Sequence, residues 1–485
     1  MCDEVFHVPL NRKKKAIAKN ASKLGKKYFM KQNNFVALIL FNQLISNAKT
    51  RNDLSYGYVY RSAVYYALKM YDECLQNIKL SRENGYPEDV WPQINDREEK
   101  CKLMLEEPRK EKCDPWKIFK LSYPPNKKVP WIADCVEVWT TEKYGRGIYA
   151  TRDLVPGDII SIEDIIVNYS CINYEYTHCF NCYKANGLNL IHCDISGHMM
   201  FCSPACRDDV YCKAINIDTI VSADVKILSD IAKAFGDLKK FDDFMLNTDL
   251  TDLNKTIFDF DFSNPNDPDY QKNLMICFLS LSANDHDQDF GHCSDIFNYV
   301  SKKAAQRIID VFRLNRRMSY ILVNKNEYLE VGCHVSLFAS LANHSCLSNA
   351  YTVLVDNKIA TVIQHPVKAG EQIFLNYTFD SASSQDLDYI QEVGMFQCDC
   401  NFCIKNKRLN MCLKKKITRA INIDEIDMFP VDDLTDYDKI KKYLDEKWKA
   451  CKNLQPRHQY YSFKVLYPLA MLDYIAGNCA YPFSV

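Results

Sequence analysis

The sequence predicts an α+β protein, in which a central region of short strands carries two cysteine-rich modules and is flanked by helical regions at both ends. Apolar residues recur at helical spacing over residues 11–110, and short alternating segments typical of strands follow. The 22 cysteines are clustered, with seven between Cys171 and Cys212 and four between Cys398 and Cys412. In a chain without a predicted secretory signal, such clusters indicate metal sites rather than disulfides.

The composition excludes several classes of protein. The chain has 485 residues, of which 47% are apolar and 25% charged, as in ordinary soluble proteins of several domains. A net charge of −1 gives no electrostatic footprint for nucleic acid, so direct DNA binding is not expected. The polar N-terminus predicts no secretory signal, and no apolar run is long enough to span a membrane. We therefore expect a cytoplasmic protein without a membrane partner, with the nucleus as a second candidate compartment.

Residues 1–112 are predicted to form helices. Leu38 and Phe41 follow helical spacing, and the segments that begin at Asn34 and Met70 read as the second helices of successive pairs. Their separation of about 36 residues resembles the unit of tetratricopeptide (TPR) repeats, which makes a peptide a candidate partner of this region. The alternative is an irregular helical layer that packs on the next domain.

A linker and a series of strands are expected next. Prolines in and beside residues 113–129 predict the linker, and the alternation of Val136 and Val138 predicts the first strand. Two glycines then flank Arg146 in the sequence Tyr-Gly-Arg-Gly-Ile-Tyr-Ala at 144–150. Glycines suit a tight turn where backbone approaches a ligand, although most such turns are only turns. Further strands are expected from residue 159, at 351–355, at 359–363 and in the segment that ends at Tyr377.

Two cysteine pairs indicate a zinc finger. The sequences Cys-Phe-Asn-Cys and Cys-Ser-Pro-Ala-Cys are separated by a short loop, and two close thiolate pairs of this kind can surround one tetrahedral zinc ion. The alternative is a set of buried free thiols. The candidate ligands are Cys179, Cys182, Cys202 and Cys206.

The second half of this finger lacks a clear ligand set. Cys193 is present, but Ser196 occupies the position where a second cysteine would complete the pair. A site improvised from His192, Cys193, His198 and Cys212 is one interpretation. We favour the other, in which this half packs without metal.

Residues 341–348 read neither as a plain strand nor as an amphipathic helix, because polar and small residues interrupt an apolar run. Asn343, His344 and Cys346 place an amide, an imidazole and a thiol within four positions. A Cys-Asp-Cys-Asn-Phe-Cys sequence follows 52 residues after Cys346. Its three thiolates are one short of a closed tetrahedral zinc site, and Cys346 can supply the fourth. The four candidate ligands are Cys346, Cys398, Cys400 and Cys403.

The order of these motifs resembles that of the SET-and-MYND (SMYD) family, in the branch with an N-terminal TPR-like extension. The resemblance rests on five features in order: the glycine turn at 144–150, the MYND-like finger, the Asn-His-Ser-Cys sequence, Tyr377 and the Cys-x-Cys-x-x-Cys cluster. It implies a SET-domain β-fold with an inserted MYND-type zinc finger and a helical insertion, between helical N-terminal and C-terminal regions. It also implies an S-adenosylmethionine-dependent protein-lysine N-methyltransferase, whose partner is a histone or another protein with a target lysine.

The resemblance further assigns roles to single residues. Tyr377 would orient the lysine amine, and Phe396 would stack on adenine. A post-SET zinc ion would be structural, since methyl transfer to a neutral amine depends on alignment in a narrow channel and needs no metal. Without the family, Tyr377 would read as packing and Asn315 as a surface residue. The expected cofactor contacts are Tyr144, Arg146, Asn315, Asn343, His344 and Phe396.

A rival interpretation is a zinc-stabilised adaptor with weak or no catalysis, which acts through its TPR-like and MYND-like surfaces. Three departures from the family favour the adaptor. The finger lacks some ligands, Arg146 stands where some relatives carry asparagine, and residues 392–395 lack basic side chains. The presence of Asn343, His344 and Tyr377 favours the enzyme. The expected divisions are a TPR-like region (1–112), a linker (113–129), the first part of the SET domain (130–178), a MYND-like finger (179–212), a helical insertion (213–330), the SET core (331–385), a post-SET zinc segment (386–410) and a helical C-terminal region (411–485).

Overall fold

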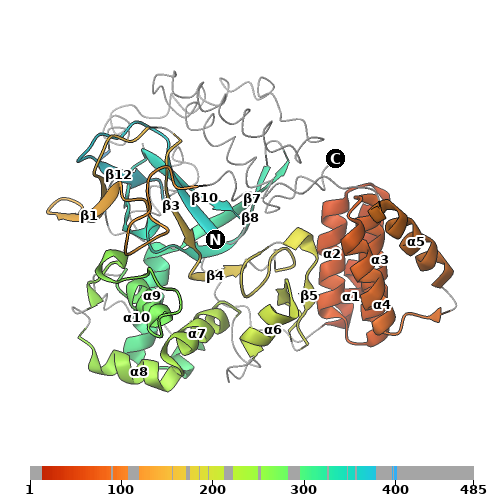
Figure 1. The fold of residues 1–485 in the computed structure, drawn as a ribbon. Helices are drawn as coiled ribbons and strands as arrows, with labels where there is room; N and C mark the ends of the chain where they lie inside the picture. Colours follow the sequence, from red (N-terminus) through yellow and green to blue (C-terminus); the bar gives the residue numbers. More distant parts are fainter. Residues whose placement is uncertain are drawn as a thin grey trace, which may run out of the picture.

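The computed structural model describes most of the first 377 residues and a short segment beyond them. The predicted C-terminal region at 411–485 lies outside the described residues, as do Cys212 and Cys403. Helices α1–α5 form a layer at one end, the finger lies beside it, and the strands lie at the other end with helices α7–α10 below them (Figure 1). The described residues are 14–88, 91–106, 120–155, 157–170, 175–184, 186–194, 196–211, 222–249, 253–281, 295–324, 327–346, 348–355, 358–377, 396 and 398–400.

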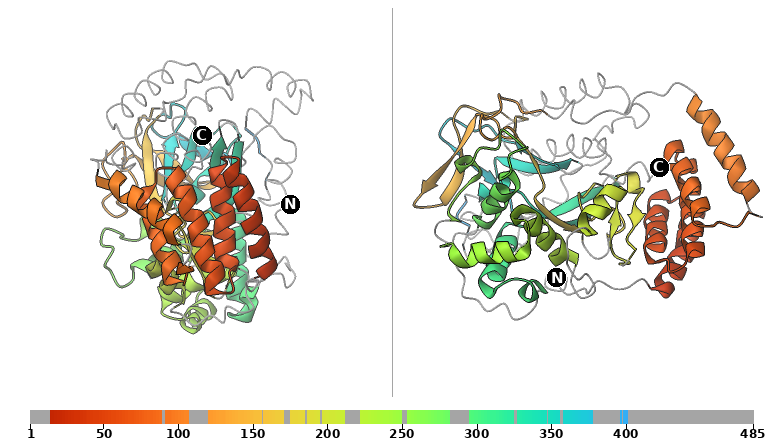
Figure 2. Two further views of the ribbon diagram at one scale, coloured as in Figure 1. Left: turned by 90° about the vertical axis from the view of Figure 1, so that its right-hand side faces the viewer. Right: turned by 60° about the horizontal axis from the view of Figure 1, so that its bottom comes forward.

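The N-terminal helices form a layer in which each helix packs on the next, and α1–α4 stand side by side (Figure 2). Side-chain caps set two of the helix starts: Asn33 accepts a hydrogen bond from the Val36 amide, and Thr50 accepts one from the Asp53 amide. Helices begin at Asn34 and Tyr71, close to the two starts expected from the sequence; the TPR assignment stays a prediction. The five helices are α1 (Lys15–Met30), α2 (Asn34–Asn47), α3 (Arg51–Ala67), α4 (Tyr71–Glu83) and α5 (Trp91–Glu106).

The strands form small sheets around a shared apolar core. One sheet has the order β1-β2-β12-β9, a second β10-β11-β3, a third β4-β8-β7, and β5 pairs with β6 in the finger. All pairings are antiparallel except that of β12 with β9. The strands are β1 (Val136–Thr141), β2 (Gly145–Ala150), β3 (Ile159–Asp164), β4 (Val167–Ser170), β5 (Ile191–His192), β6 (Met200–Phe201), β7 (Arg317–Asn324), β8 (Glu327–Val335), β9 (Asn343–His344), β10 (Ala350–Val355), β11 (Lys358–Ile363) and β12 (Gln372–Leu375).

The helical insertion is shorter than predicted. Its last helix ends at Asn315, and the antiparallel pair β7–β8 occupies the remainder of the range 213–330 that the sequence analysis assigned to helices. Tyrosine, isoleucine and valine are frequent in β7 and favour a strand. The helices, with a preceding short helix in the finger, are α6 (Pro204–Tyr211), α7 (Ser222–Phe235), α8 (Leu238–Asn247), α9 (Tyr270–Leu279) and α10 (Lys302–Asn315).

Two further boundaries differ from expectation. The described half of the predicted linker at 113–129 packs on the strands: Ser122 donates its amide hydrogen to the Ile159 carbonyl, and Val129 is fully buried. The glycine turn at 144–150 is a turn only at its start, because Gly145 has a positive φ of 64° while the rest forms β2. Both segments are therefore parts of the strand core.

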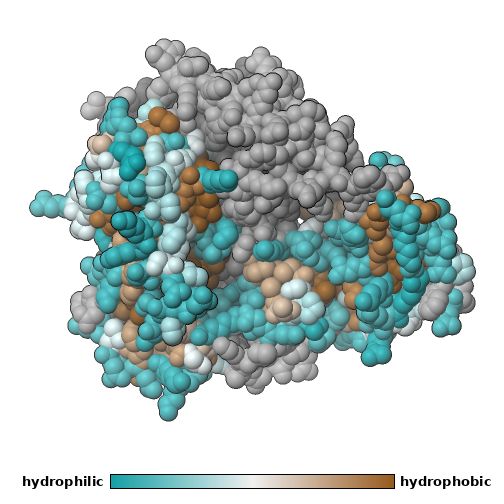
Figure 3. Space-filling model, in the orientation of Figure 1, coloured by the Kyte–Doolittle hydropathy of each residue, from teal (hydrophilic) through white to brown (hydrophobic). Residues whose placement is uncertain are grey.

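On the face seen in Figure 3, the described surface is largely hydrophilic, with apolar residues in separate patches. Exposed large apolar side chains include Met30 on α1, Leu103 on α5 and Leu246 on α8. Tyr377 and Phe396 are also exposed, by 40% and 37%, and these two lie together. No helix within the described part of the chain combines the length and apolar character needed to cross a membrane.

Candidate functional site

The Asn-His-Ser-Cys sequence lies beside the strand that leads to Tyr377. Strand β9 pairs in parallel with β12, so that Asn343 faces Phe374 and His344 faces Leu375. The amide of Tyr377, just beyond β12, donates a hydrogen bond to Nδ1 of His344 at 3.1 Å. The two sequence motifs are thus fixed to each other by backbone pairing and one side-chain contact.

Tyr377 projects its hydroxyl group toward a backbone carbonyl next to this strand. The hydroxyl donates a hydrogen bond to the Ala342 carbonyl at 2.7 Å. The ring lies 5.2 Å from the His344 ring and 6.5 Å from the Phe396 ring, between centroids, and Phe396 lies 6.0 Å from His344. The structure therefore brings together Asn343, His344, Tyr377 and Phe396.

Gly147 lets the β2 strand approach Asn343. Nδ2 of Asn343 donates to the Arg146 carbonyl at 2.8 Å. A Cβ atom on Gly147 would lie 3.0 Å from this Nδ2 atom and 2.2 Å from Nε2 of Gln372, so a larger residue would displace both amides. Gln372 was not among the predicted site residues, and only its place in the strand that leads to Tyr377 marked it in the sequence.

The side chains of Arg146 and Tyr144 lie at the start of β2. Arg146 donates through Nη2 to the Ser280 carbonyl after α9 at 2.8 Å, and its buried Nη1 has no partner among the described residues. Burial lowers the pKa of Arg146. Tyr144 packs edge-on against Phe374 with 5.5 Å between ring centroids. Asn315 ends α10 and donates to the Val311 carbonyl; no described contact joins it to this site.

A buried carboxylate supports the turn that precedes Asn343. Glu163 on β3 is only 2% exposed, and it accepts hydrogen bonds from the Ser336 hydroxyl and from the amides of Phe338 (3.0 Å) and Ala339 (3.3 Å). These donors open the short 3-10 helix η9 (Ala339–Leu341), which leads into β9. Burial raises the pKa of Glu163, and the hydrogen bonds oppose this effect. Glu163 was not predicted from the sequence, where its signal was a carboxylate that follows the apolar part of a strand.

Glu163→Leu is expected to lower the free energy of unfolding by about 3 kcal/mol, because the Ser336 hydroxyl and the Phe338 amide lose their buried acceptor, while the Ala339 amide keeps the Ser336 hydroxyl oxygen. Urea denaturation followed by tryptophan fluorescence measures this change. The control is Asp164→Asn, since Asp164 is largely exposed and its described ion pair is with Lys358 at the surface; a change of about 0.5 kcal/mol or less is expected. Equal stability of Glu163→Leu and the wild type would contradict the role given to Glu163.

Part of the predicted post-SET zinc site is present. Sγ of Cys346 lies 3.8 Å from Sγ of Cys398, and Nε2 of His344 lies 3.3 Å from Sγ of Cys346. Nδ1 of His344 accepts a hydrogen bond from the Tyr377 amide, so in the neutral imidazole Nε2 carries the hydrogen and cannot bind a metal. His344 is therefore a neighbour of the thiolates, not a ligand. Cys400 is described but does not belong to this close group, and Cys403 lies outside the described residues.

The four cysteines predicted for the finger come together. Their sulfur atoms lie within 4.8 Å of one another, and Cys202 is 3.5 Å from both Cys182 and Cys206. The hairpin β5–β6 and the start of α6 deliver Cys202 and Cys206 beside Cys179 and Cys182. Four sulfur donors at this separation fit one tetrahedral zinc ion.

The side chains considered for a second finger site do not come together. His192 contacts the Tyr58 hydroxyl at 3.1 Å, and Sγ of Cys193 accepts the Ser196 amide at 3.3 Å. His198 pairs with Glu175. Among the described residues, only the four finger cysteines and the group of His344, Cys346 and Cys398 bring three or more cysteine, histidine or acidic side chains close together, and the second group has two thiols once His344 is set aside. Cys212 lies outside the described residues.

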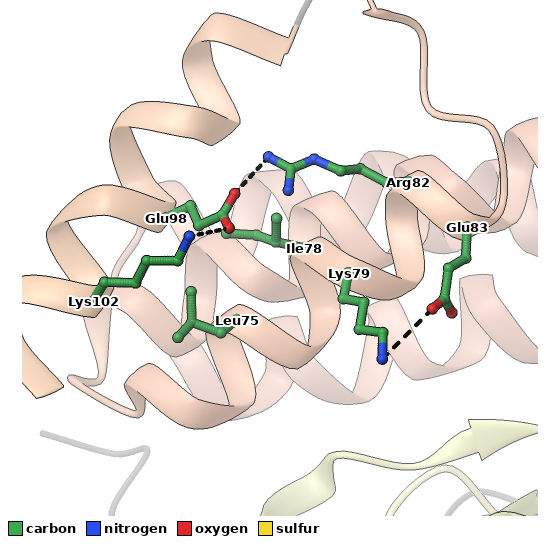
Figure 4. Close-up of a pocket in the computed structure, with 7 residues that line it drawn as sticks. All are labelled: Leu75, Ile78, Lys79, Arg82, Glu83, Glu98 and Lys102. Carbon is green, nitrogen blue, oxygen red and sulfur yellow. Dashed lines mark ion pairs between the residues drawn. The ribbon is translucent and has the colours of Figure 1, made fainter.

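A separate hollow of about 350 Å³ lies between α4 and α5 of the helical layer (Figure 4). Leu75 and Ile78 form its apolar floor. The charged groups at its rim pair with one another, Glu98 with Arg82 at 2.6 Å and with Lys102 at 2.7 Å. The hollow contains none of the residues around Tyr377 and belongs to the helical layer alone.

Comparisons with known proteins agree with this arrangement. The SET domain family matches residues 145–378. A protein-lysine N-methyltransferase SMYD4 of Danio rerio is 24% identical over 182 residues, which are 34% of this chain and 24% of that protein. SMYD4 of Homo sapiens is 30% identical over 82 residues, 17% of this chain and 10% of that protein.

These matches span a quarter or less of the length of the curated relatives. A solved SET domain of LSMT bound to lysine and AdoHcy is 14% identical, covers 51% of this chain and 50% of that chain, and has a TM-score of 0.23, which is too low to support an argument. The family match covers strands β2–β12, the finger and Tyr377, while β1 and Phe396 lie outside it. Residues 145–378 thus match the SET domain family, and parts of the chain are similar to SMYD4 proteins of the SET-and-MYND family.

Proposed function

We propose that this protein is an S-adenosylmethionine-dependent protein-lysine N-methyltransferase. The observation that carries the proposal is the Tyr377 hydroxyl, which donates its hydrogen to the Ala342 carbonyl immediately before Asn343 and His344. A phenolic oxygen has one hydrogen to donate, so its lone pairs stay available to accept from a lysine amine. The half-exposed ring leaves this oxygen within reach of a substrate.

The residues around Gly147 fit the cofactor. Gly147 leaves a space that a Cβ atom would fill, and the buried Nη1 of Arg146 is an unused donor suited to a carboxylate. Asn343 and His344 would hold the cofactor through the Asn343 amide and main-chain groups, and Phe396 offers an aromatic face for adenine. S-adenosylmethionine supplies a methyl group on a sulfonium centre. We assign Tyr144 and Asn315 to the same site on the family resemblance.

The side chains of this protein would then act by positioning. Tyr377 aligns the lysine amine, and the Ala342 carbonyl fixes the direction of its hydroxyl group. His344 holds the backbone of Tyr377 through Nδ1, and Glu163 holds the turn that precedes Asn343. Alignment of this kind can supply several kcal/mol of rate acceleration without a metal or an added base.

The proposed partner is a protein with an accessible lysine. Zinc is proposed at two structural sites, one in the finger and one at Cys346, Cys398, Cys400 and Cys403. An adaptor role is the second candidate function, and the hollow between α4 and α5 favours it, because an apolar floor with a paired charged rim suits a short peptide side chain. A measurement of lysine methylation by the intact protein decides between the methyltransferase and the adaptor.

Calorimetric titration with S-adenosylmethionine tests the cofactor site. We expect the zinc-loaded full chain to bind it in the micromolar range, and Gly147→Ala and Asn343→Ala to weaken binding by about tenfold or more, since each removes or moves the Asn343 amide. Asn266→Ala, in an exposed turn, is the control and should bind as the wild type does. Absence of binding by a folded wild-type protein would overturn the proposal and leave the adaptor.

A further inference from the structure

The second half of the finger, residues 186–198, lies against helices α2–α4 of the helical layer (Figures 1 and 2). This loop has little regular structure of its own: a three-residue 3-10 helix and the two-residue strand β5. A short loop of this kind needs a metal, a disulfide or outside contacts to hold one conformation. We infer that the helical layer takes the structural place of a second zinc ion in this finger, an inference independent of the proposed catalysis.

Arg61 of α3 is the centre of the contact. Its side chain is fully buried, and Nη1 donates to the Leu190 carbonyl and to Oδ1 of Asn42, both at 2.6 Å. Nε donates to Oδ1 of Asn77 at 2.8 Å. A buried guanidinium is costly unless its donors find acceptors, and here the finger loop supplies one of them. The Leu190 carbonyl thus adds a third acceptor to the two that the helices supply, while Nη2 has no hydrogen-bond partner among the described residues, so loss of the loop would leave this buried charge with fewer acceptors still.

Two asparagines extend the contact along the loop. Nδ2 of Asn42 donates to the carbonyls of Tyr176 and Leu188, both at 2.8 Å. Nδ2 of Asn77 donates to Oδ1 of Asn189 at 2.9 Å. Because Arg61 holds the oxygen atoms of both amides, their Nδ2 groups are directed at the finger. The loop thus receives donors from three helices at once.

Tyr65 and Asn47 hold the two ends of the loop. The Tyr65 hydroxyl donates to the Gly187 carbonyl at 3.1 Å, and Nδ2 of Asn47 donates to the Gly197 carbonyl at 3.1 Å. A Cβ atom on Gly197 would lie 2.4 Å from Oδ1 of Asn47, so the helix and the loop backbone are in direct contact. Side chains of the helices therefore fix the loop from residue 187 to residue 197.

Both ring nitrogens of the candidate ligand His192 are engaged within this region, since Nε2 lies 3.2 Å from Oδ1 of Asp194. His192 on β5 bonds to the Tyr58 hydroxyl of α3 at 3.1 Å, while Cys193 is fully buried and accepts the Ser196 amide. Hydrogen bonds from the helices to its carbonyl groups hold the loop in one conformation. In a finger with a second zinc ion, the metal would hold the loop through thiolate and imidazole ligands instead. The finger and the helical layer thereby form one structural unit with a single finger zinc.

Zinc content of the full chain is the first test. Elemental analysis after dialysis should give the same zinc content for Cys193→Ser as for the wild type, because Cys193 is not a ligand. Cys202→Ser is the matched control and should lose one zinc per chain. Loss of one zinc from Cys193→Ser would overturn the inference.

Hydrogen exchange of residues 186–198 is the second test, with β2 as the internal reference. Tyr65→Phe should lower protection of the loop about two- to fivefold through loss of one hydrogen bond, and Arg61→Met should lower it by more than about tenfold. The control, Lys79→Met, alters an exposed cation on α4 and should leave the loop unchanged. If Arg61→Met fails to fold, Tyr65→Phe decides: wild-type protection of the loop in Tyr65→Phe would overturn the inference.

Discussion

Tyr377→Phe is expected to lower the rate of lysine methylation by about 100-fold or more while leaving S-adenosylmethionine binding unchanged. The substitution removes only the hydroxyl oxygen, which is held at 2.7 Å from the Ala342 carbonyl. The ring keeps its contacts with His344 and Phe396, and the Tyr377 amide still donates to His344. The site therefore keeps its shape but loses the acceptor that aligns the amine.

The measurement is single-turnover methyl transfer to a lysine protein substrate, with cofactor affinity measured in parallel by calorimetry. A fall in the rate of transfer without a change in cofactor affinity identifies a group that acts on the transferring methyl or on the amine. Tyr123→Phe is the matched control, because that hydroxyl bonds to Asp158 in another part of the strand core. An unchanged rate in Tyr377→Phe would remove Tyr377 from catalysis and favour the adaptor.

Cys179→Ser is expected to release one zinc ion per chain and to unfold the finger. Four thiolates hold the proposed ion, and structural zinc contributes on the order of 10 kcal/mol to the folding of small fingers. Phe180 and Met200 share an apolar cluster with Ile45 and Tyr58 of the helical layer, so we expect the layer to lose packing as well.

Elemental analysis and limited proteolysis at residues 179–206 measure the effect. Cys135→Ala is the control: this thiol is fully buried in the strand core, away from the finger, and should retain the full zinc content. A wild-type zinc content in Cys179→Ser would show that the four cysteines do not bind the metal.

Local sequence signals predicted the parts of the fold that depend on local chemistry. The strands at 351–355 and 359–363, the helix starts near Asn34 and Met70, and the meeting of four finger cysteines follow from spacing and propensity. The helical prediction for the residues after Asn315 was wrong, because it was extended past the end of α10 into the strand pair β7–β8.

Long-range contacts were beyond what a single sequence could show. Glu163 and Ser336 are separated by 173 positions, and Arg61 and the Leu190 carbonyl by 129. Neither pair has a local signature, since a carboxylate in a strand and an arginine in a helix are ordinary residues until the fold buries them. The site around Tyr377 was predictable only because its motifs occur in a fixed order in a known family.

The buried network around Arg61 also limits how this chain can change in evolution. Asn42, Arg61 and Asn77 are matched to backbone carbonyls and one amide of the finger loop. A helical layer exchanged by recombination with that of a relative would bring donors that face the wrong acceptors, unless the loop were exchanged with it. The two segments, although separated by more than a hundred positions in the chain, would therefore have to be exchanged together to keep these hydrogen bonds.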